Sequence, residues 1–355
     1  MVIRGEFWAG KKVLVTGHTG FKGAWLALWL VSLDARVAGY ALKPPSEPSL
    51  WQLVEGNAGI ASTIADIRDP DRLAKAIHAF QPEIVFHLAA QSLVRPSYED
   101  PAGTYATNVM GTVNLLDAVR HMPGVRAVVN VTSDKCYQNL ETGQAYGEDD
   151  PMGGRDPYSS SKGCAELVTT AYRASFFGNS DAPALASARA GNVIGGGDWA
   201  ADRIIPDMVR AAAAGKPVLV RNPRAVRPWQ HVLEPICGYL QLAERLCAAP
   251  REFAEGWNFG SNEEDAVPVE TIVSTMARLW GPPAGWTADK GPHPHEAHFL
   301  KLDSTKARAR LGWRPRLPLQ TALEWTVRWY KKQAQGADAR QLTLAQIERY
   351  MALPT

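Results

Sequence analysis

The chain has 355 residues, which is enough to bury one large core and to carry a second lobe. Hydrophobic residues make up 46% and charged residues 21%, a balance typical of a globular enzyme and unlike that of a disordered or fibrous chain. The formal net charge is +2 with the two signs interspersed, so we expect neither nucleic acid nor a membrane as partner.

The cysteines and the N-terminal segment both favour a cytoplasmic location. The four cysteines, Cys136, Cys164, Cys237 and Cys247, form no close pair of metal-binding or redox type. The first residues lead into a basic pair without the apolar core of a signal peptide. No uncharged apolar run is long enough to span a bilayer. We therefore expect a cytoplasmic protein with reduced thiols.

Short apolar runs alternate with helical patterns in the first half, which predicts a parallel sheet with helices on both faces. The predicted strands are 12–16, 36–40, 84–88 and 127–132, and the predicted helices are 23–32 and 104–121. After about residue 180 the chain becomes rich in Gly, Pro and Trp, and we expect 186–189 and 257–260 to rejoin the sheet. A terminal helix at 319–332 should pack on the core.

These patterns indicate an α/β protein with a Rossmann-type, doubly wound parallel sheet and a smaller, interleaved C-terminal lobe. We expect residues 1–185 to form the dinucleotide-binding domain, which some later strands rejoin. Residues 186–355 should mainly form the substrate-binding lobe.

A glycine-rich loop follows the first predicted strand and opens the first helix. Gly17, Gly20 and Gly23 would let the backbone turn tightly, approach a pyrophosphate and pack the helix against the sheet. The N-terminus of the helix would then face the phosphates with free N–H groups. The loop therefore predicts dinucleotide binding by these glycines and by their neighbours Thr19, Phe21 and Lys22.

The end of the second predicted strand leaves the choice of dinucleotide open. That strand runs into Lys43 without the carboxylate that would hold an adenosine ribose and favour NAD. Lys43 could instead lie near a 2′-phosphate, so the residues alone do not exclude NADP.

A Tyr-x-x-x-Lys pattern predicts the reacting groups. Tyr158 and Lys162 would share one face of a helix that begins near Pro157. A lysine ammonium beside a phenol favours the phenolate, so Tyr158 could act as a base near neutral pH. Ser133, at the end of the 127–132 strand, could hold a substrate oxygen against Tyr158.

With the glycine loop, these three residues resemble the catalytic trio of the extended short-chain dehydrogenase/reductase family, and the resemblance covers essentially the whole chain. It implies NAD as the cofactor and a nucleotide sugar as the substrate. Asp66 and Ile67 match the place where the family holds the adenine. Leu88, Ala89, Ala90 and Asn108 match stretches near the nicotinamide, where Tyr158 and Lys162 would also contact the cofactor.

The residues after Ser133 resemble those of the sugar-nucleotide dehydratases within this family. Asp134 matches the acid that protonates the departing C6 hydroxyl, and Lys135 occupies the position of the base that removes the C5 proton. Ser-Asp-Lys here is similar to the CDP-glucose 4,6-dehydratases, as are the segments 17–23, 152–154, 191–199 and 227–231. The segment 140–145 departs from their pattern, because a tryptophan-containing loop is expected there.

Two roles for Lys135 stay open at this point. It could be the C5 base, for which it must be neutral when it acts, or it could remain cationic and stabilise the enolate. Asp134 needs a raised pKa to serve as an acid, which a closed and poorly hydrated site would provide.

The resemblance further implies a set of substrate-binding residues. These are Gln91, Ser133, Asn192, Arg203, Arg227 and His295. The histidine cluster at 293–298 lacks the ligand set of a zinc site, so we expect no metal. Family members usually dimerise through the helices that follow residues 104 and 158, which implies a homodimer or a dimer-based oligomer. The product would feed deoxysugar synthesis for cell-surface polysaccharide, such as lipopolysaccharide O-antigen.

Two other functions remain possible on the sequence. The first is another nucleotide-sugar 4,6-dehydratase or a 4-epimerase of the same fold, although an epimerase has no hydroxyl to expel and so no need of Asp134. The second is a non-catalytic dinucleotide-binding protein, in which loss of Ser133, Tyr158 or Lys162 would be expected.

Overall fold

Seven parallel strands form the central sheet, in the order β11-β7-β5-β4-β1-β2-β3. The computed structural model describes residues 3–141, 143–179, 182–289, 291 and 299–354. The strands of this sheet are β1 (Lys12–Thr16), β2 (Arg36–Ala41), β3 (Ile60–Ile64), β4 (Ile84–His87), β5 (Ala127–Val131), β7 (Ala184–Ala190) and β11 (Gly256–Phe259). The predicted Rossmann-type sheet is therefore confirmed, and β7 and β11 are the two later strands expected to rejoin it.

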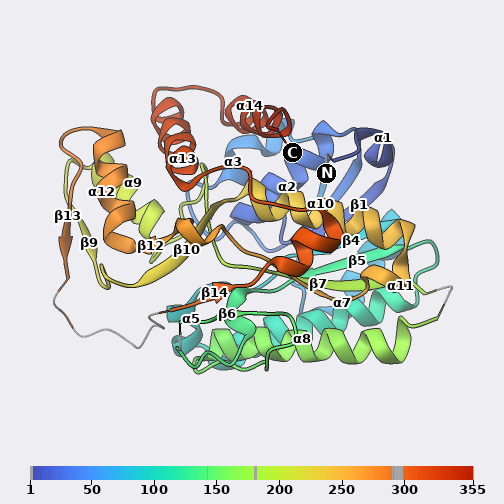
Figure 1. Ribbon diagram of the computed structural model, residues 1–355. Coiled ribbons are helices and arrows are strands. Elements are labelled where there is room, and N and C mark those ends of the chain that lie inside the picture. The colour runs from blue at the N-terminus through green and yellow to red at the C-terminus, as the bar shows by residue number, and fades with distance from the viewer. Residues whose placement is uncertain (1–2, 142, 180–181, 290, 292–298, 355) are drawn as a thin grey trace.

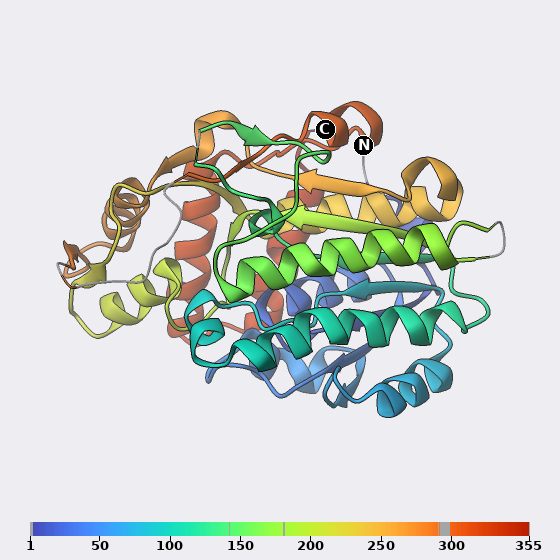
Figure 2. The ribbon, with the colours of Figure 1, turned by 90° about the horizontal axis from the view of Figure 1, so that it is seen from below.

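Helices cover both faces of this sheet (Figure 1). One face packs against α2 (Phe21–Ser32) and α10 (Leu233–Ala248), and the other against α4 (Pro70–Phe80), α7 (Gly111–Arg120) and α8 (Pro157–Phe176). Figure 2 shows α7 and α8 lying side by side across the second face. Successive side chains of a strand point to opposite faces, so Val13 and Val15 enter one core and Leu14 the other. Burial on both faces explains why these strands appear as continuous apolar runs in the sequence.

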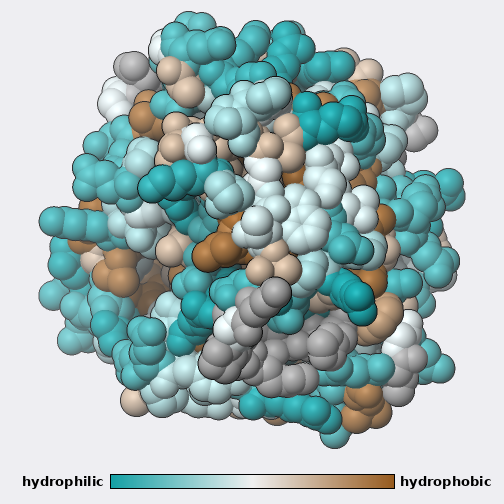
Figure 3. Space-filling model, turned by 90° about the vertical axis from the view of Figure 1, so that its left-hand side faces the viewer, coloured by the Kyte–Doolittle hydropathy of each residue, from teal (hydrophilic) through white to brown (hydrophobic). Residues whose placement is uncertain are grey.

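The second lobe consists of small sheets and helices on one side of the main sheet. Its elements are β8 (Asn192–Ile194), β9 (Val218–Val220), β10 (Val226–His231), β12 (Ala266–Pro268), β13 (Trp286–Ala288), α9 (Ile204–Ala213) and α12 (Val269–Trp280). Hydrophilic residues predominate on the face of the molecule that this lobe forms (Figure 3). Because β7, α10 and β11 belong to the main sheet layers, the lobe is interleaved in sequence with the first domain. The proposed boundary between 185 and 186 falls inside β7.

Two C-terminal helices pack on the rest of the chain. Helix α13 (Leu319–Ala334), which includes the predicted 319–332 helix, contacts α12 and β10, and α14 (Ala339–Met351) contacts α2 and α3. The sequence analysis did not identify α14 or β3. The remaining short elements are α1 (Gly5–Trp8), α3 (Leu50–Val54), α5 (Val94–Glu99), α6 (Pro101–Tyr105), α11 (Pro250–Phe253), β6 (Ala145–Tyr146) and β14 (Lys301–Leu302). Within the described ranges, no helix is both long and apolar enough to cross a bilayer.

The glycine loop between β1 and α2 depends on the absence of side chains. Gly17 has φ +77°, and a Cβ there would lie 2.7 Å from the backbone nitrogen of Ala89. A Cβ on Gly23 would lie 2.1 Å from the carbonyl oxygen of Gly17. These two contacts agree with the tight turn and the close helix packing that the sequence predicts.

We expect Gly17→Ala to lower the free energy of unfolding by about 3 kcal/mol, because it adds a backbone clash to a left-handed conformation. Gly10→Ala is the matched control, since Gly10 has φ +73° but nothing within 4 Å of an added Cβ. It should cost only about 1 kcal/mol. Urea denaturation of both variants without cofactor measures the difference. If both variants lose the same free energy of unfolding, the clash between the added Cβ and residues 88–89 contributes nothing.

Candidate active site

The predicted cofactor loops lie together at the carboxyl edge of the sheet. The chain leaves β1 into Gly17–Gly20 and leaves β4 into Leu88–Ala90, and these strands are neighbours. The hydroxyl of Thr16 joins the two loops by accepting hydrogen bonds from the backbone N–H groups of Leu88 and Ala89, at 3.2 Å each. The crevice at this point, where the strand order reverses, is where open α/β sheets bind their ligands.

Asn108 connects the loop after β4 to helix α8. Its amide oxygen accepts from the Gln91 N–H at 2.8 Å, and its amide nitrogen donates to the Gln91 carbonyl at 2.9 Å and to Ser161 Oγ at 2.8 Å. Asn108 lies in a π-helical turn between α6 and α7, which interrupts the predicted 104–121 helix. The Gln91 side chain bonds to Leu93 and Thr104, so its polar atoms have partners around its own loop.

Asp66, predicted to lie near the adenine, is paired with a neighbour in this structure. The Arg68 guanidinium donates to it from Nε at 3.0 Å and from Nη2 at 2.6 Å. The hydrogen bonds from Arg68 hold the pKa of Asp66 below its ordinary value, against the effect of burial. Ile67 is buried and packs beside Gly111. The adenine role of both residues stays a prediction.

The predicted catalytic trio lies together and is buried. Ser133 directly follows the Val131–Thr132 end of β5, and Tyr158 and Lys162 occupy the first turns of α8. The helix begins at Pro157 because Asp156 caps it, accepting from the Ser159 N–H at 2.9 Å.

The pKa values of this trio are set mainly by burial. Burial raises the pKa of Tyr158 to about 12, although the hydrogen bond with Ser133 acts in the opposite direction. Burial also lowers the pKa of Lys162 to about 8, against the charge of Glu166. In the protein alone, desolvation of the phenolate outweighs the effect of nearby cations, and the role of Tyr158 as a base near neutral pH stays a prediction.

Asp134 and Lys135 begin a single 3₁₀ turn, Asp134–Cys136, immediately after Ser133. The Asp134 side chain is 3% exposed and accepts from Ser133 Oγ at 2.9 Å. Burial raises its pKa, while Lys135 and Ser133 act to lower it. The raised pKa that an acid requires is thus confirmed. Lys135 is only half-buried, and its backbone N–H donates to Ser133 Oγ at 3.2 Å.

Lys22 extends from the glycine loop toward these catalytic groups. Its ammonium donates to the Tyr239 hydroxyl at 3.3 Å. Its pKa is lowered to about 7, mainly by burial and also by the charges of Arg203 and Lys162, while the charge of Asp134 acts to raise it. The sequence analysis placed Lys22 among the cofactor-binding residues and did not find its electrostatic contact with Asp134. A lysine within the otherwise apolar start of α2 is the signal that could have indicated it.

Two predicted substrate-binding arginines approach the catalytic groups from the second lobe. Arg203 donates to Asp198 at 3.0 Å and to Ser92 Oγ at 3.3 Å, and its charge lowers the pKa of Tyr158. The charge of Arg227, on β10, likewise lowers the pKa of Asp134.

Two of the predicted substrate-binding residues remain to be placed, Asn192 and His295. Asn192 begins β8 and pairs with Trp229 of β10, beside Arg227. His295 lies outside the described residues. Among the residues that are described, no group of three or more His, Cys, Asp and Glu side chains could hold a metal ion.

The segment that departs from the expected tryptophan-containing loop is anchored beside β14. Leu140 N–H donates to the Tyr146 hydroxyl at 2.8 Å, and Asn139 donates to the Phe299 carbonyl at 2.8 Å. Strand β6 at its end pairs with β14.

Comparison with known proteins agrees with this arrangement. The family described as GDP-mannose 4,6 dehydratase matches residues 14–326. The chain belongs to this family. It is 54% identical to the CDP-glucose 4,6-dehydratase of Salmonella typhimurium, over 99% of both chains. It is 29% identical to a dTDP-glucose 4,6-dehydratase of Xanthomonas campestris, over 89% of this chain and 92% of that protein.

A solved structure shows the same fold. The UDP-glucose 4-epimerase of Thermus thermophilus, in complex with NAD, superposes with a TM-score of 0.76. It is 25% identical, and the match covers 90% of this chain and 99% of that chain. The predicted membership of the extended short-chain dehydrogenase/reductase family is therefore confirmed, as is the resemblance to CDP-glucose 4,6-dehydratases.

We expect Arg227→Ala to raise the KM for a nucleotide sugar about tenfold, because it removes a charge-assisted hydrogen-bond donor from the site. Arg224→Ala is the matched control, since Arg224 is exposed and lies three residues earlier. Its KM should stay within about twofold of the parent value. Steady-state kinetics of the two variants provide the comparison, and equal KM values would remove Arg227 from substrate binding.

Proposed function

We propose that the protein is a CDP-glucose 4,6-dehydratase, which converts CDP-D-glucose to CDP-4-keto-6-deoxy-D-glucose and water by internal hydride transfer through NAD. The observation that carries this proposal is the turn Ser133-Asp134-Lys135 beside Tyr158, with Asp134 buried and its pKa raised. The 54% identity to a CDP-glucose 4,6-dehydratase over 99% of the chain supports the choice of nucleotide.

The glycine loop fits NAD. Gly17 and Gly23 leave no room for side chains, so the backbone can approach a pyrophosphate at the N-terminus of α2. Thr19 is held by its hydrogen bond to the Leu42 carbonyl at 2.8 Å, which fixes the loop against the end of β2. NAD supplies, when bound, the acceptor for the C4 hydride and the donor for C6.

In the first chemical step, Tyr158 takes the proton of the C4 hydroxyl. Since burial holds its pKa at about 12, the phenol needs nearby positive charge to act as a base. Lys162, one helical turn away, has a pKa of about 8 and is mostly cationic at neutral pH. Ser133 Oγ orients the substrate oxygen and the phenol.

In the second step, water leaves across C5–C6. Asp134, whose pKa burial raises, donates a proton to the departing C6 hydroxyl. Lys135 lies next to it and either removes the C5 proton itself or, as a cation, stabilises the enolate while another base takes that proton. Its half-buried position is compatible with either role.

The cations around this turn suit the diphosphate of a nucleotide sugar. We assign that contact to Arg203 and Arg227, with Asn192 beside them on β8. Gln91 and His295 remain predicted contacts. We also propose a homodimer formed through the surface of α6, the following π turn and α8, because Tyr105, Met110, Leu167 and Phe176 are exposed there.

A 4-epimerase is the nearest alternative on the same fold. The buried Asp134 favours the dehydratase, because an epimerase would bury this carboxyl without using its proton. A non-catalytic dinucleotide-binding protein is the second alternative. The presence of Ser133, Tyr158 and Lys162 together at one site argues against it.

We expect Asp134→Asn to lower the rate of water loss about a hundredfold or more while still allowing oxidation at C4. Reduced cofactor should therefore accumulate on the variant after CDP-glucose is added, which absorbance spectroscopy detects. Normal turnover of this variant would remove Asp134 from the mechanism.

We expect Tyr158→Phe to abolish even the first oxidation, because the C4 hydroxyl then has no base. When this change is combined with Asp134→Asn, no reduced cofactor should accumulate under the same conditions. Accumulation equal to that of Asp134→Asn would assign the base role to another residue.

The substrate is tested by mass spectrometry with NAD and a panel of CDP-glucose, dTDP-glucose, UDP-glucose and GDP-mannose. We expect loss of one water from CDP-glucose alone. If none of the four loses water, the dehydratase proposal fails and the two alternatives come forward.

A further inference from the structure

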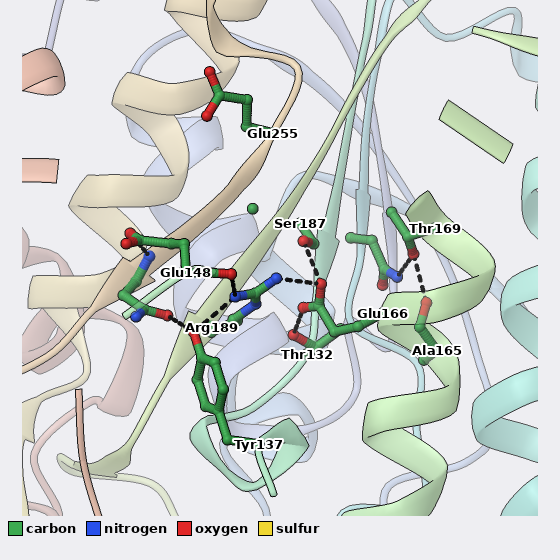
Figure 4. A network of polar contacts seen from close by, with 12 residues as sticks. Thr132, Tyr137, Glu148, Ala165, Glu166, Thr169, Ser187, Arg189 and Glu255 are labelled. Carbon is green, nitrogen blue, oxygen red and sulfur yellow. Dashed lines mark hydrogen bonds and ion pairs between the residues drawn. The ribbon is translucent and has the colours of Figure 1, made fainter. Parts of the chain in front are cut away.

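A buried ion pair lies beneath the catalytic turn. Glu166, on α8 one turn beyond Lys162, pairs with Arg189 of β7 at 2.9 Å, and the two side chains are 1% and 5% exposed. The Glu166 carboxylate also accepts from Thr132 Oγ1 and, at 2.7 Å, from Ser187 Oγ. Figure 4 shows this network and the elements that contribute to it.

The two ends of the catalytic turn are each bonded to this pair. Thr132, which directly precedes Ser133, donates to Glu166. The hydroxyl of Tyr137, which directly follows the turn, accepts from Arg189 Nη1 at 2.7 Å. Figure 4 shows Thr132 and Tyr137 converging on the pair from either side. The pair thus spans the segment that carries Ser133, Asp134 and Lys135.

The same pair connects this segment to the helix of the other catalytic groups. Tyr158, Lys162 and Glu166 are spaced by four residues on α8 and share one face of the helix. Burial raises the pKa of Glu166, but the Arg189 charge and the hydrogen bonds outweigh it, so Glu166 stays ionised. A buried carboxylate that is paired and accepts hydrogen bonds from Thr132, Ser187 and Arg189 is costly to displace.

We propose that the Glu166–Arg189 pair is a positioning device, which holds both flanks of the 133–136 turn and so fixes Asp134 and Lys135 relative to Tyr158 and Lys162. This inference rests on the proposed function for its kinetic consequence. A water molecule can be eliminated only if the acid and the base meet the same sugar ring, and displacement of about 1 Å can cost about a hundredfold in rate.

The test removes the two flank contacts and leaves the ion pair intact. Thr132→Val and Tyr137→Phe delete one hydroxyl each with little change of shape, whereas Glu166→Gln would leave Arg189 buried without its counter-ion and could unfold the chain. In the double variant we expect kcat for water loss to fall about tenfold to a hundredfold, with the KM for CDP-glucose within about twofold of the parent. As a single variant, Thr132→Ser keeps a hydroxyl at this position and should therefore keep the parent kcat, unlike Thr132→Val.

Hydrogen exchange of the cofactor-free protein gives a readout that needs no activity. The amides of Lys135 and Cys136 bond to Ser133 within the turn. They should exchange about tenfold or more faster in the double variant, while amides in the second half of α8 keep their rates.

Glu244→Gln is the control for a purely structural loss. Glu244 is 2% exposed on α10 and accepts from Arg4 and Trp8, outside both the turn and α8. It should lower stability without lowering kcat at a temperature where the protein is folded.

The proposal is overturned if the double variant keeps its kcat, or if kcat falls while exchange in the 133–136 turn is unchanged. It is also overturned if Glu244→Gln lowers kcat equally. If the parent protein releases no water from any sugar nucleotide, the proposed function fails instead, and hydrogen exchange alone decides whether the pair holds the turn.

Discussion

The loops that carry most of the predicted site residues lie together because the strands of the main sheet are parallel. Parallel strands bring their carboxyl ends to one edge, so the loops after β1, β4 and β5 meet although they are far apart in the chain. The order reverses between β1 and β4, which separates the helices there and leaves a crevice. The glycine loop lines one side of this crevice, and the turn after β5 lies beyond β4 on the other side.

Burial connects this arrangement to the chemistry. The desolvation that raises the pKa of Asp134 and Tyr158 also lowers that of Lys162 and Lys22. A raised pKa makes a carboxyl a better proton donor near neutral pH, and a phenol with a high pKa requires cations beside it before it can lose its proton. We propose that the lysines and arginines around the turn provide that positive charge as well as a contact for a diphosphate. Burial of these side chains therefore serves both steps of the proposed reaction.

The strands and the glycine loop could be predicted from sequence because their signals are local. Continuous apolar runs mark strands buried on both faces, and Gly17 and Gly23 stand where backbone meets backbone. The contact of Lys22 with Tyr239 and the Glu166–Arg189 ion pair could not be predicted, because each joins residues that are distant in the chain. The raised pKa of Tyr158 could not be predicted for a similar reason. Spacing places Lys162 nearby but does not reveal how deeply the phenol is buried.

We propose that one site removes a hydride from C4, expels water and returns the same hydride to C6. CDP-glucose carrying deuterium at C4 tests this most directly, in ordinary water with NAD, by mass spectrometry and NMR of the product. We expect a 4-keto-6-deoxy sugar nucleotide that retains the deuterium, now at C6. A product without deuterium at C6, or a C4 epimer that has lost no water, would contradict it.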